Sequence, residues 1–202
     1  MNIFSVDPKN PDFSLLNEAA EIVKAGGLVA FPTETVYGIA AMADNAEAVE
    51  WLSRLKKRPP DKPFSYHFGS LEAFYSFAGK SLPANIRRFV NHFCPGPVTV
   101  IYTDHSRDRK IGIRIPDNLV AEIFLTRCAD PVFAPSANPA SLKSPVTPQE
   151  VKNYFEDQID ALIDAGPCTI GKNSTVVELT EKDYSIIRPG ALPEEDISEF
   201  FL

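Results

Sequence analysis

A dense group of cationic side chains is the stretch of this sequence best suited to chemistry. It holds five of the chain's 20 lysines and arginines within nine consecutive positions, although the formal net charge is -7: Arg54, Lys56, Lys57, Arg58 and Lys62. Three prolines between positions 59 and 63 stiffen the backbone beside them. A stiff backbone holds charged side chains in a preset geometry at a low cost in entropy. The pattern favours a site that binds an anion.

A second interpretation of the same cations is the solvated end of a helix. Residues 46–55 predict a helix, which the prolines at positions 59 and 60 forbid to continue. Val49, Leu52 and Leu55 share one apolar face of that helix. Cations in a last helical turn are stabilised by the helix dipole, by roughly 0.3–1 kcal/mol each. These residues alone leave both interpretations open.

Further polar and cationic residues recur in or just after short apolar segments. They are Thr33, Thr35, His67, Arg114, Ser136, Asn138, Ser174 and Arg188. In open α/β sheets, ligands bind outside the carboxyl ends of the strands. We therefore expect these side chains to form, with Arg58 and Lys62, one pocket rich in cations and hydroxyls. Such a pocket suits a polyanion with polar attachments, for instance a nucleotide.

Single members of this set also have plainer explanations. A turn accounts for Thr33 and Thr35, and a lone histidine such as His67 is more often structural. Arg114 is harder to dismiss, because an arginine inside an apolar strand is usually paired or faces a ligand. The sequence contains neither HExxH nor GxSxG. This argues against a covalent hydrolase and favours catalysis by positioning and charge stabilisation.

The elements that must position these residues alternate along the chain. Strands are expected at 28–31, 64–68, 98–102, 111–116, 131–134, 174–179 and 184–187. Helices are expected at 13–25, 46–55, 70–78, 83–93 and 118–126, after the capping box that Thr147 begins, and in the acidic tail. Asp117 is the expected cap of the helix at 118–126. The order predicts an α/β fold, a twisted open mixed sheet with helices on its faces.

The segment from Gly166 to Lys172 imitates a phosphate-binding loop by its glycine and lysine spacing. Asn173 stands where that loop needs Ser or Thr for magnesium, and the residues from Ser174 to Leu179 favour a strand instead of a helix. A glycine-rich turn before a strand is the better interpretation.

Composition places the chain among ordinary globular proteins. Its 202 residues are 44% hydrophobic and 23% charged, which fits one domain with a substantial core. No apolar run approaches the ~20 residues that span a bilayer, so we expect a cytoplasmic protein without membrane contact. The cysteines, Cys94, Cys128 and Cys168, show no disulfide or zinc spacing. The net negative charge argues against tight nucleic-acid binding over the whole surface, but a local basic groove stays open.

Seven motifs taken together, in order along nearly the whole chain, resemble the YrdC-like family of threonylcarbamoyl-AMP synthases. They are Phe31-Pro32-Thr33-Glu34-Thr35-Val36-Tyr37-Gly38, Lys56-Lys57-Arg58-Pro59, Pro95-Gly96-Pro97-Val98-Thr99, Arg114-Ile115-Pro116, Ser136-Ala137-Asn138, Ser174-Thr175-Val176-Val177 and Arg188-Pro189-Gly190. The resemblance implies the YrdC-like α/β fold as a single domain over residues 1–202, the short form of the family.

The resemblance also implies an activity. L-threonine, bicarbonate and ATP, the last together with Mg²⁺, would give L-threonylcarbamoyl-AMP and pyrophosphate, and the product would feed the N6-threonylcarbamoyladenosine (t6A) modification of tRNA. By the same resemblance, the catalytic residues are Lys56, Arg58, Ser136 and Asn138. ATP would be held by Arg58, Lys62, Ser136, Ser144 and Arg188, and threonine by Thr35, His67, Arg114, Ala134 and Ser174. The implied partners are tRNA or double-stranded RNA and the downstream proteins that transfer the threonylcarbamoyl group.

The chain departs from the family pattern at three places. Cys94 replaces a frequent tryptophan, Lys172-Asn173 replaces Leu-Glu, and residues 140–143 lack a serine-glycine pair, which puts the assignment of Ser144 in question. Two alternatives stay open: an RNA-binding module of the same fold, and a YciO-like relative without synthase activity. YciO-type proteins tend to lack the K-x-R pair that Lys56 and Arg58 form here, which favours the synthase.

Overall fold

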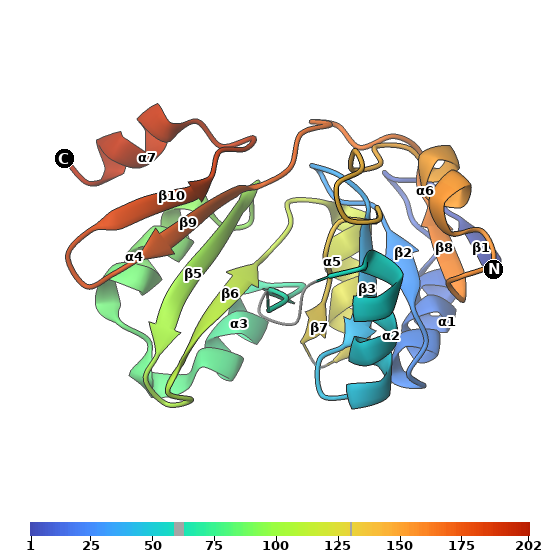
Figure 1. Ribbon diagram of the computed structural model, residues 1–202, viewed down its shortest axis with the longest axis horizontal. Helices are drawn as coiled ribbons and strands as arrows, with labels where there is room; N and C mark the ends of the chain where they lie inside the picture. Colours follow the sequence, from blue (N-terminus) through green and yellow to red (C-terminus); the bar gives the residue numbers. More distant parts are fainter. Residues whose placement is uncertain (59–62, 130) are drawn as a thin grey trace.

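The computed structural model describes residues 1–58, 63–129 and 131–202. Its strands form one ten-stranded mixed sheet in the order β1-β8-β2-β3-β7-β4-β6-β5-β9-β10 (Figure 1). Helices cover its faces, so the predicted α/β class with an open mixed sheet is confirmed.

The strands are β1 (Asn2–Ser5), β2 (Val29–Phe31), β3 (Gly38–Met42), β4 (Tyr66–His67), β5 (Val98–Asp104), β6 (Arg109–Arg114), β7 (Val132–Phe133), β8 (Ala161–Asp164), β9 (Thr175–Leu179) and β10 (Tyr184–Arg188). The helices are α1 (Phe13–Lys24), α2 (Ala46–Lys56), α3 (Leu71–Ala78), α4 (Ala84–Phe93), α5 (Leu119–Cys128), α6 (Pro148–Phe155) and α7 (Glu194–Phe200), with a 3-10 turn at Gly79–Ser81.

One half of the sheet, from β1 to β7, is covered by helices on both faces. Leu16 and Val23 of α1 pack with α5 against one face, where the rings of Phe31 and Phe124 lie 5.1 Å apart. Helices α2 and α6 cover the opposite face, with Leu52 in the same cluster as the β2 residue Ala30. Burial on both faces explains why β2 and β3 consist of small and apolar residues.

The other half, from β6 to β10, packs one face against α3, α4 and α7 (Figure 1). Val98, Val100 and Tyr102 of β5 point into that cluster. Because side chains alternate along a strand, Thr99 points to the opposite face. Arg114 lies on the same face, since its strand neighbour Ile113 pairs with Val100. This second face of β5, β6 and β9 carries much of the polar site.

Local signals in the sequence predicted these helix starts to within one residue. The capping box is present, with Thr147 and the Glu150 side chain exchanging hydrogen bonds with the backbone. The prediction for α5 was wrong in its cap: Asn118, not Asp117, accepts from the backbone N–H of Ala121. Asn118 has the extended backbone that a cap requires, and the helix begins one residue later than expected.

Three strands were not predicted, namely β1, β3 and β8. β1 and β8 are four residues each and pair in parallel with each other, so neither has a turn partner nearby in the sequence. The segment expected as a strand at 64–68 pairs only over Tyr66 and His67. The segment from Gly166 to Lys172, which has the spacing of a phosphate-binding loop, is confirmed as a loop before a strand, because β9 and not a helix follows it. The three cysteines are free, and Cys94 and Cys128 are buried.

Candidate functional site

The segment Thr33–Val36 forms a tight turn after β2. The Thr33 hydroxyl accepts the backbone N–H groups of Thr35 and Val36 at 3.1 and 3.2 Å and donates to the Val36 carbonyl at 2.7 Å. It also lies 2.9 Å from the Thr35 hydroxyl. The interpretation as a turn is therefore correct, but the turn also has a role in the site, because it presents Glu34 and Thr35 to β6.

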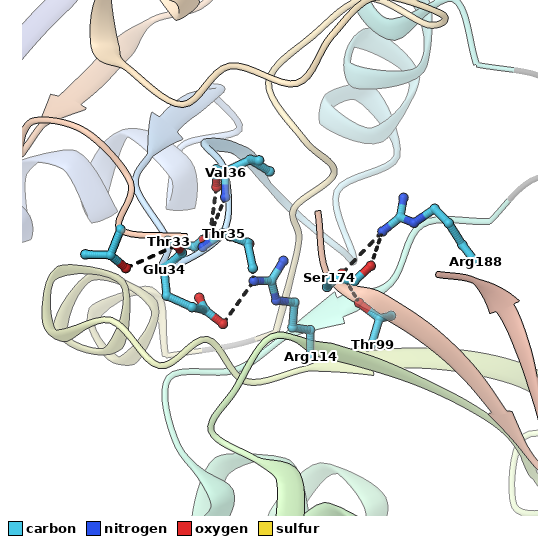
Figure 2. A network of polar contacts seen from close by, with 9 residues as sticks. Thr33, Glu34, Thr35, Val36, Thr99, Arg114, Ser174 and Arg188 are labelled. Atoms are coloured by element: carbon cyan, nitrogen blue, oxygen red, sulfur yellow. Dashed lines mark hydrogen bonds and ion pairs between the residues drawn. The ribbon is translucent and has the colours of Figure 1, made fainter. Parts of the chain in front are cut away.

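Arg114 reaches from the end of β6 to this turn (Figure 2). Its Nη2 donates to the Thr35 hydroxyl and lies 3.1 Å from Oε1 of Glu34. Both side chains of the ion pair are buried, at 7% and 6% exposure. The pair therefore joins the two halves of the sheet at the place where the predicted residues meet. It also explains how an arginine can end an apolar strand.

His67 lies next to Arg114, because their positions pair in the register of β4 and β6. Its Nδ1 is 3.1 Å from the Ser65 carbonyl oxygen. Burial, and to a lesser degree the Arg114 charge, lowers the pKa of His67 to about 3, although the Ser65 hydrogen bond acts in the opposite direction. At neutral pH the ring is uncharged, so Nδ1 carries the hydrogen and donates to the Ser65 carbonyl, which leaves Nε2 as an acceptor.

Arg188 ends β10 and turns to the start of β9. Its Nη2 donates to the Ser174 carbonyl at 2.8 Å and contacts the Ser174 hydroxyl at 3.3 Å. The same hydroxyl lies 2.9 Å from that of Thr99 (Figure 2). Gly190 allows this packing, since a Cβ there would lie 2.3 Å from the Thr175 nitrogen. Thr99 was not predicted as a site residue; its place in the Pro-Gly-Pro-Val-Thr motif was the available signal.

Lys56 is buried at the end of α2 and crosses to the loop after β7. Its Nζ donates to the Ser136 carbonyl and, at 2.7 Å, to the Asn138 carbonyl. Burial, followed by the charge of Arg58, lowers the pKa of Lys56 to about 8. The Lys56 side chain thus holds the backbone of the S-x-N motif, which brings two distant predicted motifs together.

Asn138 organises the rest of that loop. Its Nδ2 donates to the carbonyls of Pro139 and Leu142 at 2.9 and 2.8 Å, and its Oδ1 accepts the Ser144 hydroxyl at 3.2 Å. Ser144 therefore lies at the S-x-N loop despite the altered residues before it. The loop also meets β3, because Ser136 forms a bridge with Gly38. A Cβ at Gly38 would lie 3.6 Å from the Ala134 carbonyl, so the Ala134 backbone is close as well.

Arg58 connects the Lys56 region with Arg188. Its guanidinium lies 4.6 Å from the centre of the Phe64 ring and donates to the Pro63 carbonyl at 2.7 Å. Burial lowers the pKa of Arg58, with the Arg188 charge as the second cause, and the pKa of Arg188 is lowered by burial and then by Arg114. Neighbouring cations are thus arranged in series: Lys56, Arg58, Arg188 and Arg114.

Not every predicted cation belongs to this series. The Arg54 side chain is 72% exposed and pairs with Glu50 on its own helix, and Lys57 is exposed, so the solvated helix end is the correct interpretation for these two. Lys62 lies outside the described residues. Glu34 was missed as a candidate, although it stands between two predicted threonines. Where the chain is described, no three His, Cys, Asp or Glu side chains gather as a metal site, and none of its helices is long and apolar enough to cross a membrane.

Known proteins of one family are similar to this chain in sequence and in fold. A family model described as "Telomere recombination", which covers Sua5, YciO and YrdC proteins, matches residues 21–190. The threonylcarbamoyl-AMP synthase of Pyrococcus abyssi is 35% identical over 189 residues, which are 90% of this chain and 55% of that protein. This chain spans about half the length of this synthase and of those from Bacillus subtilis and Schizosaccharomyces pombe.

Two solved structures agree with the fold over nearly the whole chain. The crystal structure of P. abyssi Sua5 complexed with L-threonine has a TM-score of 0.91 at 32% identity, covering 99% of this chain and 61% of that chain. The crystal structure of Escherichia coli YciO has a TM-score of 0.85 at 26% identity and covers both chains completely.

Proposed function

The chain belongs to the Sua5/YciO/YrdC family, and from this premise we propose that it forms L-threonylcarbamoyl-AMP and pyrophosphate from L-threonine, bicarbonate and ATP. The product would supply the t6A modification of tRNA in the cytoplasm, through partner proteins that transfer the threonylcarbamoyl group. Residues 1–202 would act as one domain, which the single continuous sheet supports.

The observation that carries the proposal is the series of cations next to a group of hydroxyls. After burial, the Arg188 charge is the second cause that lowers the pKa of Arg58, and the Arg114 charge is the second cause for Arg188; a triphosphate is the ligand that would relieve this repulsion between neighbouring cations. We assign ATP binding to Arg58, Lys62, Ser136, Ser144 and Arg188. Mg²⁺ would arrive bound to the phosphates of ATP, as it commonly does at sites that bind it through few protein ligands.

The part of the site that carries hydroxyl side chains would bind threonine. We assign threonine binding to Thr35, His67, Arg114, the backbone at Ala134, and Ser174. A guanidinium such as that of Arg114 can bind a carboxylate through two hydrogen bonds. Neutral His67 and Ser174 can form hydrogen bonds with the polar side chain of the substrate threonine. The Sua5 structure with L-threonine bound supports an amino-acid site in this fold.

The chemistry would be adenylyl transfer assisted by preset charges. Threonine that carries a carboxylate on its nitrogen attacks the α-phosphorus of ATP, and pyrophosphate leaves. Negative charge builds on the phosphoryl oxygens during this step, and donors that are already in place stabilise it without reorganisation. Arg58 would act on the phosphates directly, whereas Lys56, with Ser136 and Asn138, would hold the loop that faces them.

One comparison favours a second candidate function. The E. coli YciO structure shares the fold of this chain, with a TM-score of 0.85 at 26% identity. A YciO-like protein of the same fold without synthase activity is therefore the alternative. The K-x-R pair of Lys56 and Arg58 and their place in the cation series favour the synthase.

Pyrophosphate release by the purified protein tests the proposal. With ATP, L-threonine and bicarbonate together, we expect continuous release, and omission of threonine or bicarbonate should abolish it. If pyrophosphate is released at the same rate without threonine and without bicarbonate, the protein only hydrolyses ATP. No release from a folded protein that binds ATP would favour the YciO-like alternative.

A further inference from the structure

Glu34 is the one acidic side chain that the described structure places in direct contact with the cation series. It is 5% exposed, and its Oε1 lies 3.1 Å from Nη2 of Arg114. Among the described residues, neither carboxylate oxygen accepts a hydrogen bond, and Nε of Arg114 donates none. Buried charges normally have their hydrogen-bonding capacity filled. The pair therefore keeps unused donors and acceptors inside the site.

The position of Glu34 is fixed through its backbone and not through its carboxylate. Its carbonyl oxygen accepts the N–H of Ile170 at 2.8 Å and the hydroxyl of Thr169 at 3.3 Å. The Thr33 turn fixes the other side (Figure 2). The carboxylate is thus held in place at the site while its oxygens stay available for a new partner.

The other buried carboxylate in the described chain has a different environment. Asp104, at the far end of β5, accepts hydrogen bonds from Arg107 and from the backbone and hydroxyl of Ser106. Its capacity is filled by the chain itself. The contrast shows that the open capacity of Glu34 is particular to this site.

The pair of Arg114 and Glu34 matches the two charges of an amino acid. A zwitterion carries a carboxylate next to an ammonium group, and these can pair with a guanidinium and a carboxylate that lie side by side. Because the two side chains now face each other, binding would exchange one internal ion pair for two with the substrate. Arg114 would turn to the substrate carboxylate, and Glu34 would receive the ammonium group.

We propose that Glu34 binds the ammonium group of the amino-acid substrate and accepts its proton. This inference rests on the proposed function and deepens it. An ammonium nitrogen has no lone pair and cannot attack carbon, so one proton must leave before the nitrogen is carboxylated. Among the described residues, Glu34 is the carboxylate that contacts this series of cations and is placed to take that proton.

The proton moves from the ammonium nitrogen to a Glu34 oxygen, and the freed lone pair forms a bond to the carbon of bicarbonate. The bond from that carbon to its hydroxyl breaks, and the leaving hydroxide combines with a second proton of the nitrogen to give water. Ammonium and bicarbonate thus become a carbamate, one water and one proton, which Glu34 holds and later releases to solvent.

The variants Glu34→Gln and Glu34→Asp test this role, with Glu178→Gln as the matched control. Glu178 also forms an ion pair with a cation of β6, Lys110, near the opposite end of that strand from Arg114. Two rates are measured for each protein: forward pyrophosphate release, and the reverse formation of ATP from threonylcarbamoyl-AMP and pyrophosphate. The reverse direction needs only the adenylyl step, so it also reports whether the site is folded.

We expect Glu34→Gln to slow the forward reaction at pH 7 by about 100-fold or more, which is the usual size of a general-base contribution. The reverse rate should stay within about threefold of the wild type. Glu34→Asp keeps a carboxylate and should recover part of the forward rate. Glu178→Gln should match the wild type in both directions.

A pH series adds a result that a structural role would not give. The forward rate ratio of wild type to Glu34→Gln should shrink by about tenfold or more from pH 7 to pH 9, because free amine becomes abundant without a base. The ratio is the proper measure because other titratable groups lie near the pair: Cys94 and Cys168, whose pKa values the charges of Arg114 and Glu34 affect, and His67 beside Arg114.

Equal losses in the forward and reverse rates would overturn the inference, because Glu34 would then only support Arg114. A forward rate in Glu34→Gln like that of Glu178→Gln would overturn it as well. A wild-type protein without threonine-dependent pyrophosphate release would contradict the proposed function itself, and the inference would fall with it.

Discussion

The ammonium group of Lys56 donates a hydrogen bond of 2.7 Å to the backbone carbonyl of Asn138, so the end of α2 fixes the loop after β7. The same group donates to the Ser136 carbonyl. A lysine with this burial and these acceptors acts on the site by holding the backbone in place. The K-x-R and S-x-N motifs are therefore one structural unit.

Lys56→Met should separate these two motifs. Removal of the ammonium group leaves the carbonyls of Ser136 and Asn138 without their hydrogen-bond donor. We therefore expect the free energy of unfolding to fall by about 1–3 kcal/mol. Pyrophosphate release should fall by about 100-fold, because the donors facing the phosphates are no longer preset. Urea unfolding and the release assay measure both effects. Arg54→Ala, an exposed cation of the same helix, is the control; near-normal turnover in Lys56→Met would contradict this account.

Arg188→Met tests the assignment of Arg188 to ATP. A charge-assisted hydrogen bond to phosphate contributes about 1.5–3 kcal/mol, so the KM for ATP should rise by about tenfold or more. Arg109→Met removes a cation from the remote end of β6, where it contacts the Tyr66 hydroxyl, and should leave that KM unchanged. A KM that rises equally in both variants would indicate a general effect of charge instead of a binding site.

His67→Asn should change how stability depends on pH. The folded pKa of about 3 lies below the ordinary value of 6.5, so in this window the unfolded chain binds a proton that the folded chain does not. Wild-type stability should therefore fall as pH drops from 6.5, by up to about 1.4 kcal/mol per pH unit from this residue. Urea unfolding at pH 6.5, 5.5 and 4.5 should show a shallower decline for His67→Asn. Parallel declines would show that His67 is not buried in its neutral form.

Ionic strength separates a nucleotide site from an RNA-binding surface. Binding to an RNA backbone that contacts six or more phosphates weakens by about 10³-fold or more between 50 and 200 mM salt. Lys56 and Arg114 are buried, Arg58 is half-buried and Arg188 alone of the four is exposed, so we expect the KM for ATP to change by less than about tenfold over that range. Fluorescence anisotropy with double-stranded RNA, alongside the ATP titration, makes the comparison. Tight, steeply salt-dependent RNA binding with no ATP binding would favour the RNA-binding module.

The sequence predicted the fold well where the signals are local. The cap at Thr147 and the run of β-branched residues in β5 depend on neighbouring residues, and both predicted elements are present in the structure. β1 and β8 could not be found in this way. Their pairing joins residues 2–5 with 161–164, and such a pairing is decided by the tertiary fold.

The site shows the same division between local and distant information. Polar residues at strand ends indicated which side chains would meet, and Arg114 with Thr35 is the clearest case. The sequence could not show that Lys56 ends on backbone carbonyls, or that Glu34 is the partner of Arg114. Both depend on contacts across about 80 positions of the chain.

The fate of the bicarbonate carbon tests the central claim most directly. The purified protein is incubated with ATP, L-threonine and ¹³C-labelled bicarbonate, and the adenylate is analysed by mass spectrometry within seconds. The account predicts an AMP adduct that contains threonine and the labelled carbon. An adduct of threonine and AMP without the label, or AMP with no adduct, would contradict it.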